Sequence, residues 1–97
     1  MPNIVVSYPK SEGASFDADY YRDTHIPLAE RTWAPHGLSG ADILWPADDA
    51  QPFAAMVVLA FESDAAIDAA MGDPGTAEVM GDVPRFTNIQ PTIYRTA

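Results

Sequence analysis

The segment from Phe53 to Phe61 reads FAAMVVLAF and is the longest apolar run in the chain. Its β-branched and aromatic residues predict a β-strand, and the run is too short to cross a bilayer as a helix. Apolar and polar residues do not alternate in it, so both faces of the strand are apolar and both need cover. The helices of a 97-residue chain form one layer only. The segment therefore predicts a central strand whose second face is covered by another copy of the protein.

The segments on either side predict a hairpin before this strand and helices after it. Leu38–Trp45 (LSGADILW) is expected to form a strand, and the polar turn Pro46–Pro52 joins it to the central one. Ser63 is a good N-cap for a helix that ends at Gly72. A second, short helix is expected from Pro74 to Gly81, because proline is favoured at the first helical position.

The two ends of the chain supply the outer elements. Asn3–Tyr8 predicts a first strand, and Ile89–Tyr94 predicts a last one. Pro91 cannot donate a hydrogen bond to a ladder, which favours an edge position for that strand. The order is then β-α-β-β-α-β, an α+β fold with a four-stranded antiparallel sheet. Right-handed crossovers place the first and third strands in the centre.

The stretch FDADYYRDTHIPL, residues 16 to 28, predicts the first helix. Asp17 is a good N-cap, and Pro27 is expected to bend or restart the helix, which then runs on to about Trp33. At about 100° per residue, one side of this helix carries five side chains: Asp17, Tyr21, Thr24, His25 and Leu28. The charged residues fall on the other side, so His25 is expected to face inward, one turn from a phenol.

This stretch carries a resemblance to a known family. The residues Phe-Asp-x-x-Tyr-Tyr-x-x-Thr-His-x-Pro-Leu resemble the motif of the EthD-like family, small proteins named after a component of ethyl tert-butyl ether degradation. Asp82–Asn88 (DVPRFTN) also resembles the segment that closes such chains, and length and element order agree from end to end. The resemblance implies a ferredoxin-like unit, one domain over residues 1–97, that dimerises into an α+β barrel. It says little about the reaction, because biochemical roles in the family are mostly unassigned.

His25 and Tyr21 are the candidate catalytic residues. Histidine titrates nearest neutral pH, so His25 is suited to act as a general acid or base. Tyr21 is placed to donate a hydrogen bond to a developing oxyanion or enolate. The alternative is a purely structural role, in which His25 is a satisfied core histidine and Tyr21 packs its ring against the sheet.

Four other aromatic residues are candidates for binding a ligand. They are Tyr20, Trp33, Phe61 and Phe86. Each can instead be an ordinary core residue, and Tyr20 can pack with its hydroxyl group at the rim. Arg85 is one of only five basic residues and can either anchor an anionic ligand or form a surface ion pair.

Composition excludes several classes of function. A net charge of −9 argues against nucleic acid and anionic membranes as partners. The absence of cysteine removes disulfides, thiolate nucleophiles and cysteine-based zinc sites. No spacing typical of a metal site, a phosphate-binding loop or a nucleophile elbow occurs, so we expect neither a metal nor a nucleotide cofactor. The N-terminus does not read as a signal peptide, and a cytoplasmic location is expected.

Two functional classes remain open. The first is a cofactor-independent enzyme of isomerase, lyase or oxygenase type, acting by proton transfer on a small apolar carbonyl or aromatic compound. The second is a binding or accessory protein that holds such a compound without converting it. A haem-binding role is a more distant alternative that rests only on the barrel architecture.

Overall fold

A computed structural model describes all 97 residues and contains one four-stranded sheet with helices between its strands. The strands are β1 (Asn3–Pro9), β2 (Leu38–Leu44), β3 (Phe53–Phe61) and β4 (Thr92–Arg95). The α-helices are α1 (Ala18–Tyr20), α2 (Ile26–Trp33), α3 (Asp64–Met71) and α4 (Gly75–Gly81). Three further helical turns complete the elements: the π-helical η1 (Tyr21–His25) and the 3₁₀-helical η2 (Ala34–His36) and η3 (Val83–Arg85).

The sheet has the order β2-β3-β1-β4 and every pairing in it is antiparallel. The α+β fold predicted from the sequence is therefore confirmed, with the first and third strands in the centre. β3 pairs on both sides, with β1 and with β2, which confirms its predicted central position. No helix has the length and apolar content that crossing a membrane would need.

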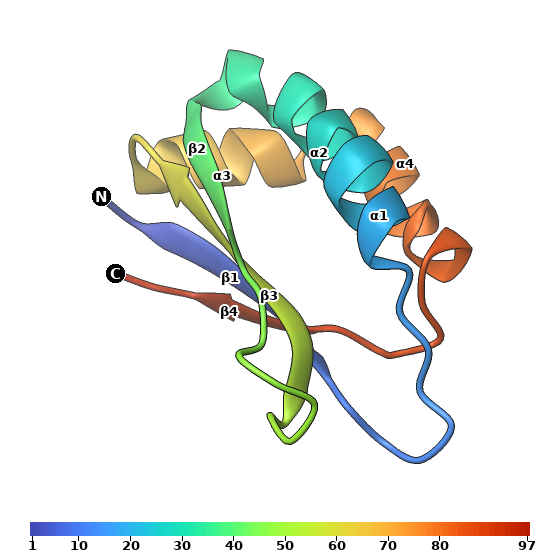
Figure 1. The fold of residues 1–97 in the computed structure, drawn as a ribbon. Helices are drawn as coiled ribbons and strands as arrows, with labels where there is room; N and C mark the ends of the chain where they lie inside the picture. The colour runs from blue at the N-terminus through green and yellow to red at the C-terminus, as the bar shows by residue number, and fades with distance from the viewer.

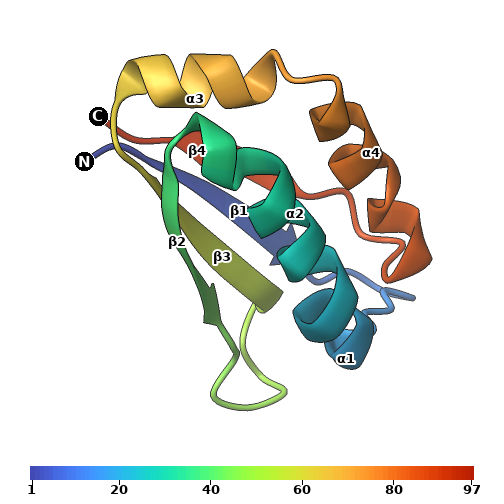
Figure 2. The ribbon, with the colours of Figure 1, turned by 90° about the horizontal axis from the view of Figure 1, so that it is seen from above.

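All helices lie on one face of the sheet, and no element covers the other face (Figures 1 and 2). Alternate residues of β3 point into the helical layer and are buried, from Ala55 to Phe61. The residues between them point to the open face, where Val58 lies between Val5 of β1 and Asp42 of β2. Tyr94 of β4, opposite Val5, is 66% exposed. The helical layer thus completes the core on one side only.

The last strand begins later than the sequence predicts. We expected Ile89–Tyr94, whereas β4 spans Thr92–Arg95 and Pro91 lies just before it. Ile89 is buried as part of a loop, and its N–H is bonded to Oγ1 of Thr87. The apolar side chain suggested a strand, but the ladder with β1 starts only after the proline, which has no N–H to donate.

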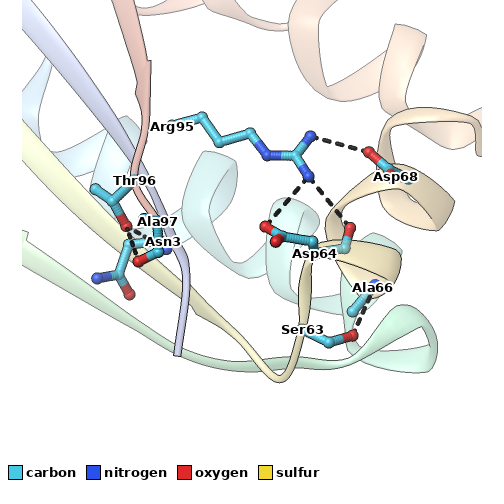
Figure 3. A network of polar contacts seen from close by, with 8 residues as sticks. All are labelled: Asn3, Ser63, Asp64, Ala66, Asp68, Arg95, Thr96 and Ala97. Carbon is cyan, nitrogen blue, oxygen red and sulfur yellow. Dashed lines mark hydrogen bonds and ion pairs between the residues drawn. The ribbon is translucent and has the colours of Figure 1, made fainter.

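The helix α3 is fixed at its start and along its exposed side, as Figure 3 shows. Ser63 accepts a hydrogen bond from the N–H of Ala66 (3.0 Å), which confirms it as the N-cap. Arg95 of β4 reaches α3, where its guanidinium donates to Asp68 (2.9 Å) and pairs with Asp64 (3.4 Å). These ion pairs are exposed, so they orient α3 across the edge strand more than they stabilise the fold.

The helices α2 and α4 approach each other closely at Gly75. A Cβ atom added there would lie 2.9 Å from Cγ2 of Thr32 and 3.0 Å from Oδ1 of Asp73. Neither atom is free to move: Thr32 donates its hydroxyl to the carbonyl of Leu28, and Asp73 accepts the N–H of Gly75 (2.6 Å). Asp73 is also bonded to Nε2 of His36. The close contact between α2 and α4 therefore depends on the absence of a side chain at Gly75.

We predict that Gly75→Ala destabilises the protein by about 1–3 kcal/mol, the usual cost of an added methyl group in a tight contact. Gly81 is the matched control in the same helix, because nothing lies within 4 Å of the Cβ that alanine would add. Gly81→Ala should be neutral or stabilising by about 0.4–1 kcal/mol. Urea unfolding of both variants at one protein concentration measures the difference. Equal effects of the two substitutions would show that the α2–α4 contact is not tight.

Candidate functional site

The first helical segment widens into a π-turn where it carries the candidate histidine. Asp17 caps the segment by accepting the N–H of Tyr20 (3.1 Å), as predicted. The N–H of Ile26 then bonds to the carbonyl of Tyr21, five residues back, instead of four. Pro27 follows and has no N–H, so it cannot make the α-helical bond to residue 23. The expected break is thus a wide turn inside a continuous helix.

The π-turn changes which side chains face the core. Tyr21 and His25 are both buried, whereas Thr24, which regular α-helical spacing places on the same side, is exposed. A wider turn rotates residues three apart away from each other, which explains the difference. The rings of Tyr21 and His25 stack nearly parallel, with centroids 5.6 Å apart and planes inclined by 18°. π-turns are often found at functional sites.

His25 is held by a carboxylate from the far end of the chain. Its side chain is buried, and Nδ1 lies 3.0 Å from Oδ2 of Asp82, a residue 57 positions away. The other oxygen of Asp82 accepts the hydroxyl of Tyr20 at 2.8 Å and lies 3.6 Å from Nε of Arg85. Phe86 packs against the imidazole, with ring centroids 4.6 Å apart.

The charges in this group follow from burial and hydrogen bonding. Burial lowers the pKa of His25 and outweighs the opposing hydrogen bond and charge of Asp82. Burial alone would raise the pKa of Asp82, but the hydrogen bonds from His25 and Tyr20, with the charge of Arg85, hold it below its usual range. At neutral pH the pair is therefore a neutral imidazole that donates its Nδ1–H to an ionised carboxylate.

This tautomer leaves Nε2 of His25 as a base with a free lone pair. Nε2 makes no hydrogen bond, since the contact of His25 with Asp82 is through Nδ1. Among the side-chain nitrogen and oxygen atoms, only the hydroxyl oxygen of Tyr21 is both fully buried and without a hydrogen-bond partner. Nε2 of His25, which also has no partner, is therefore not fully buried. An oriented imidazole with one accessible nitrogen is the arrangement that general acid–base chemistry requires.

The hydroxyl of Tyr21 is the second unusual group. The residue is completely buried, among the rings of Tyr8, Phe16 and Phe86. Burial, together with the neighbouring Tyr8, raises its pKa, so the phenol remains protonated and able to donate. Burial also raises the pKa of Tyr8 to about 12. An unpaired hydroxyl in this position costs about 1–3 kcal/mol.

Tyr21 and His25 both line one cavity between the sheet and the helices. Its volume is about 30 Å³, which is enough for a single water molecule. Its walls come from β1, β3, η1, α2 and α4, and they are almost entirely apolar. The site in this conformation is therefore closed to anything larger than water.

The other candidate residues are placed in different ways. Tyr20 and Phe86 join His25 around Asp82, as described above. Trp33 lines the same cavity and donates its indole N–H to Thr76 (2.8 Å). Phe61 is fully buried beside Trp33, with ring centroids 6.4 Å apart, and does not line the cavity. Arg85 forms the ion pair with Asp82 and is largely exposed.

Asp82 is a further candidate residue of the site, which reasoning from the sequence placed in a loop segment but did not single out. It lies immediately after Gly81, at the C-cap of α4, where the helix dipole disfavours a negative charge. An acidic residue in that position is the signal that could have identified it. Thr87 and Asn88, in the same segment, bind the loop before the first helix through Ser15 and Gly13 rather than facing the cavity. Nowhere do three or more histidine, aspartate or glutamate side chains converge as metal ligands.

Comparison with solved structures places this fold among known proteins. An EthD-like protein from Ralstonia eutropha JMP134 is 30% identical, with a TM-score of 0.83 over 98% of this chain and 88% of the other. An EthD-family protein from Bacillus halodurans C-125 is 16% identical, with a TM-score of 0.68 over 95% of this chain and 96% of the other. SnoaB from Streptomyces nogalater, a cofactor-independent oxygenase, is 11% identical, with a TM-score of 0.66 over 99% and 91%.

No curated protein matches this sequence. The EthD domain model matches residues 12–90, which include the capped first helix, the π-turn, His25 and Asp82. With that match and the likeness to the Ralstonia protein, the chain belongs to the EthD family.

Proposed function

We propose that this protein is a cofactor-independent enzyme that transfers a proton on a small apolar carbonyl or aromatic compound, with His25 as the acid–base group. The observation that carries the proposal is the hydrogen bond between Nδ1 of His25 and Asp82, because it fixes the tautomer and leaves Nε2 as the base. The apolar walls of the adjoining cavity favour an uncharged substrate.

The chemistry uses three side chains. Nε2 of His25 removes a proton from the carbon beside a carbonyl group, and the imidazolium that forms is stabilised by the charge of Asp82. The hydroxyl of Tyr21 donates a hydrogen bond to the enolate oxygen as negative charge develops there. Return of the proton to another carbon completes an isomerisation, whereas loss of a β-hydroxyl group, protonated by the imidazolium, completes a dehydration. Deprotonation of an electron-rich phenol is the step that would precede its reaction with O₂.

The fold itself is compatible with such chemistry. SnoaB, which has the same fold, is described as a cofactor-independent oxygenase. At 11% identity this likeness supports the idea that the scaffold can work without a cofactor, and the choice of reaction rests on the residues of this chain.

The first test is a generic assay for proton abstraction. We expect the protein to catalyse exchange of the α-protons of 2-tetralone with D₂O, followed by ¹H NMR. His25→Gln should lower the rate by about 10²–10⁴-fold, and Asp82→Asn should also lower it, because the imidazole then loses its orienting charge. The rate should stay high at pH values somewhat below 6.5, since burial lowers the pKa of His25.

Matched measurements separate catalysis from binding alone. Asp19→Asn removes an exposed carboxylate near the start of the same helix, in contact only with Arg22, and should leave the rate unchanged. If several ketones and phenols bind to the wild-type protein but none exchanges or reacts, the non-catalytic binding function replaces the proposal.

The hydrogen-bonded pair of His25 and Asp82 should make the stability of the fold depend on pH. The pKa of His25 is lower in the folded protein than the ordinary value of about 6.5, so the unfolded chain binds a proton more readily. The free energy of unfolding should therefore decrease as the pH falls from 7.5 to 5.5. In His25→Gln this decrease should be smaller, although the variant is less stable at pH 7.5. Urea unfolding at both pH values measures it, and an unchanged pH dependence in the variant would contradict a neutral, buried His25.

We further propose that a second copy of the protein covers the open face of the sheet. Val5, Val58 and Met56 form apolar positions there, and Leu44 is 50% exposed at the edge. Apolar side chains gathered on an uncovered sheet face favour a partner that buries them.

Light scattering should give twice the monomer mass of 10.5 kDa at micromolar concentration. Val58→Glu puts a second negative charge beside Asp42 on that face and should yield monomers with unchanged far-UV circular dichroism. Ala69→Glu, on the exposed side of α3, should leave the mass unchanged. A monomeric wild-type protein would rule the dimer out.

A further inference from the structure

The closed cavity beside His25 is too small for the substrate proposed above. Its volume of about 30 Å³ accepts one water molecule, whereas small-molecule pockets usually measure about 300–1,000 Å³. If His25 acts on an organic compound, the body of that compound must lie in a neighbouring space. The two spaces must also have a wall in common, so that movement of that wall joins them.

One depression on the surface shares part of its wall with the cavity. It has a volume of about 370 Å³ and is formed by residues between the end of α4 and the start of β4. Three side chains line both spaces: Met80, Val83 and Pro91. The other large surface depressions share no residue with the cavity. We call this space the α4–β4 depression.

The shared wall lies beside the imidazole. Asp82 stands in the chain between Met80 and Val83, and its carboxylate lies 3.0 Å from Nδ1 of His25. His25 lines the cavity together with Met80 and Val83. No residue of the α4–β4 depression belongs to a strand, so the depression is separate from the open face of the sheet. A gap in the shared wall therefore opens into the space that His25 lines.

Met80 is the member of this wall that can rotate. Val83 is buried and β-branched, which restricts its χ1 angle, and the ring of Pro91 is fixed to the backbone. Met80 is unbranched, has three rotatable bonds and is 40% exposed. The helix around it is closed by the N–H of Asp82, which bonds to the carbonyl of Glu78 (3.1 Å). Rotation of the Met80 side chain thus opens the wall without moving α4.

The lining of the α4–β4 depression suits an uncharged, largely apolar compound. No charged side chain lines it, in contrast to the depressions that contain Arg85. Two of its polar side chains already have partners, because Thr87 and Asn88 are bonded to the loop before the first helix. Its volume lies in the range usual for small-molecule pockets.

We propose that Met80 gates the His25 site and that the α4–β4 depression binds the body of the substrate, an uncharged, largely apolar compound of about two rings. This inference rests on the proposed function and adds to it the route, the charge and the size class of the ligand. When Met80 rotates, the carbonyl end of the ligand passes between Val83 and Pro91 toward His25, and the remainder stays in the depression.

The first test follows binding by NMR and does not depend on turnover. The probe is 2-naphthol, a planar analogue of the enol of 2-tetralone, and the protein is labelled with [methyl-¹³C]methionine. The chain has four methionines, and loss of one signal in Met80→Ile assigns Met80. We expect a saturable shift of the Met80 methyl signal and, over the same concentration range, a shift of the imidazole ¹⁵N signals of His25. Met71, which is 43% exposed on α3, is the internal control and should not respond.

The pattern of responses separates the gate from the proposed function. If His25 responds and Met80 does not, the ligand enters elsewhere, and the gate is wrong while the proposed function stands. A response of Met80 alone shows that the depression does not lead to the site, which also overturns the gate. With neither responding, the ligand class fails. If both respond but 2-tetralone does not exchange, the gate stands as the entrance of a binding site and proton transfer fails.

The second test measures how fast 2-naphthol binds, by stopped flow with its fluorescence as the signal. Met80→Ala removes the gate, so the association rate constant should rise about fivefold or more. Met80→Ile keeps a wall of β-branched, stiff shape and should lower the rate constant by a similar factor. Met71→Ala should change it less than about twofold. Changes in the same direction for the two Met80 variants, or none, would show that Met80 only packs there.

Discussion

Asp82 carries a negative charge at a place where the fold disfavours it, and the arrangement of the site depends on how that charge is compensated. The carboxylate is mostly buried and lies at the C-terminal end of α4, where the helix dipole is also negative. Two hydrogen bonds, from His25 and Tyr20, and the nearby guanidinium of Arg85 hold it there. A buried carboxylate without partners is very costly. Removing any one of these three partners should therefore destabilise the ionised form of Asp82. The carboxylate of Asp82 thereby connects the end of α4 to the first helical segment through hydrogen bonds.

The π-turn is the local distortion that makes this joint possible. In a regular α-helix Pro27 would leave the carbonyl of Asp23 without its partner, since proline has no N–H. The wider turn moves the bonding pattern by one residue, so that Ile26 bonds to Tyr21 instead. It also stacks Tyr21 on His25 and turns Thr24 outward. Pro27, which predicts a helix break in the sequence, is therefore accompanied by a π-turn that orients the imidazole of His25.

Much of the scaffold could be predicted from the sequence because local rules decide it. The apolar β3, the caps Asp17 and Ser63, and the end of α3 at Gly72 all follow from side-chain chemistry within a few residues. The start of β4 could not, since Ile89 is buried by a loop and not by a strand. The partner of His25 lies 57 residues away, and no periodicity links the two positions. What sequence patterns miss here is the pairing of distant polar groups, which only the assembled fold determines.

The hydroxyl of Tyr21 is the strongest argument that the interior of this protein is not merely a packed core. A phenylalanine ring would make the same contacts with Tyr8, Phe16 and Phe86 and would avoid the cost of a buried oxygen without a partner. Tyr8 is the polar neighbour that, after burial, raises the pKa of Tyr21, and a water molecule or a ligand that accepts the phenolic proton would add a hydrogen bond of full strength. Tyr21 lines the same cavity as His25, whose free nitrogen likewise has no partner in the closed state. Under the proposed function, a donor and a base carried by two residues that line one small cavity suit a carbonyl group flanked by an acidic C–H bond, which would bond to both once the cavity opens to admit it.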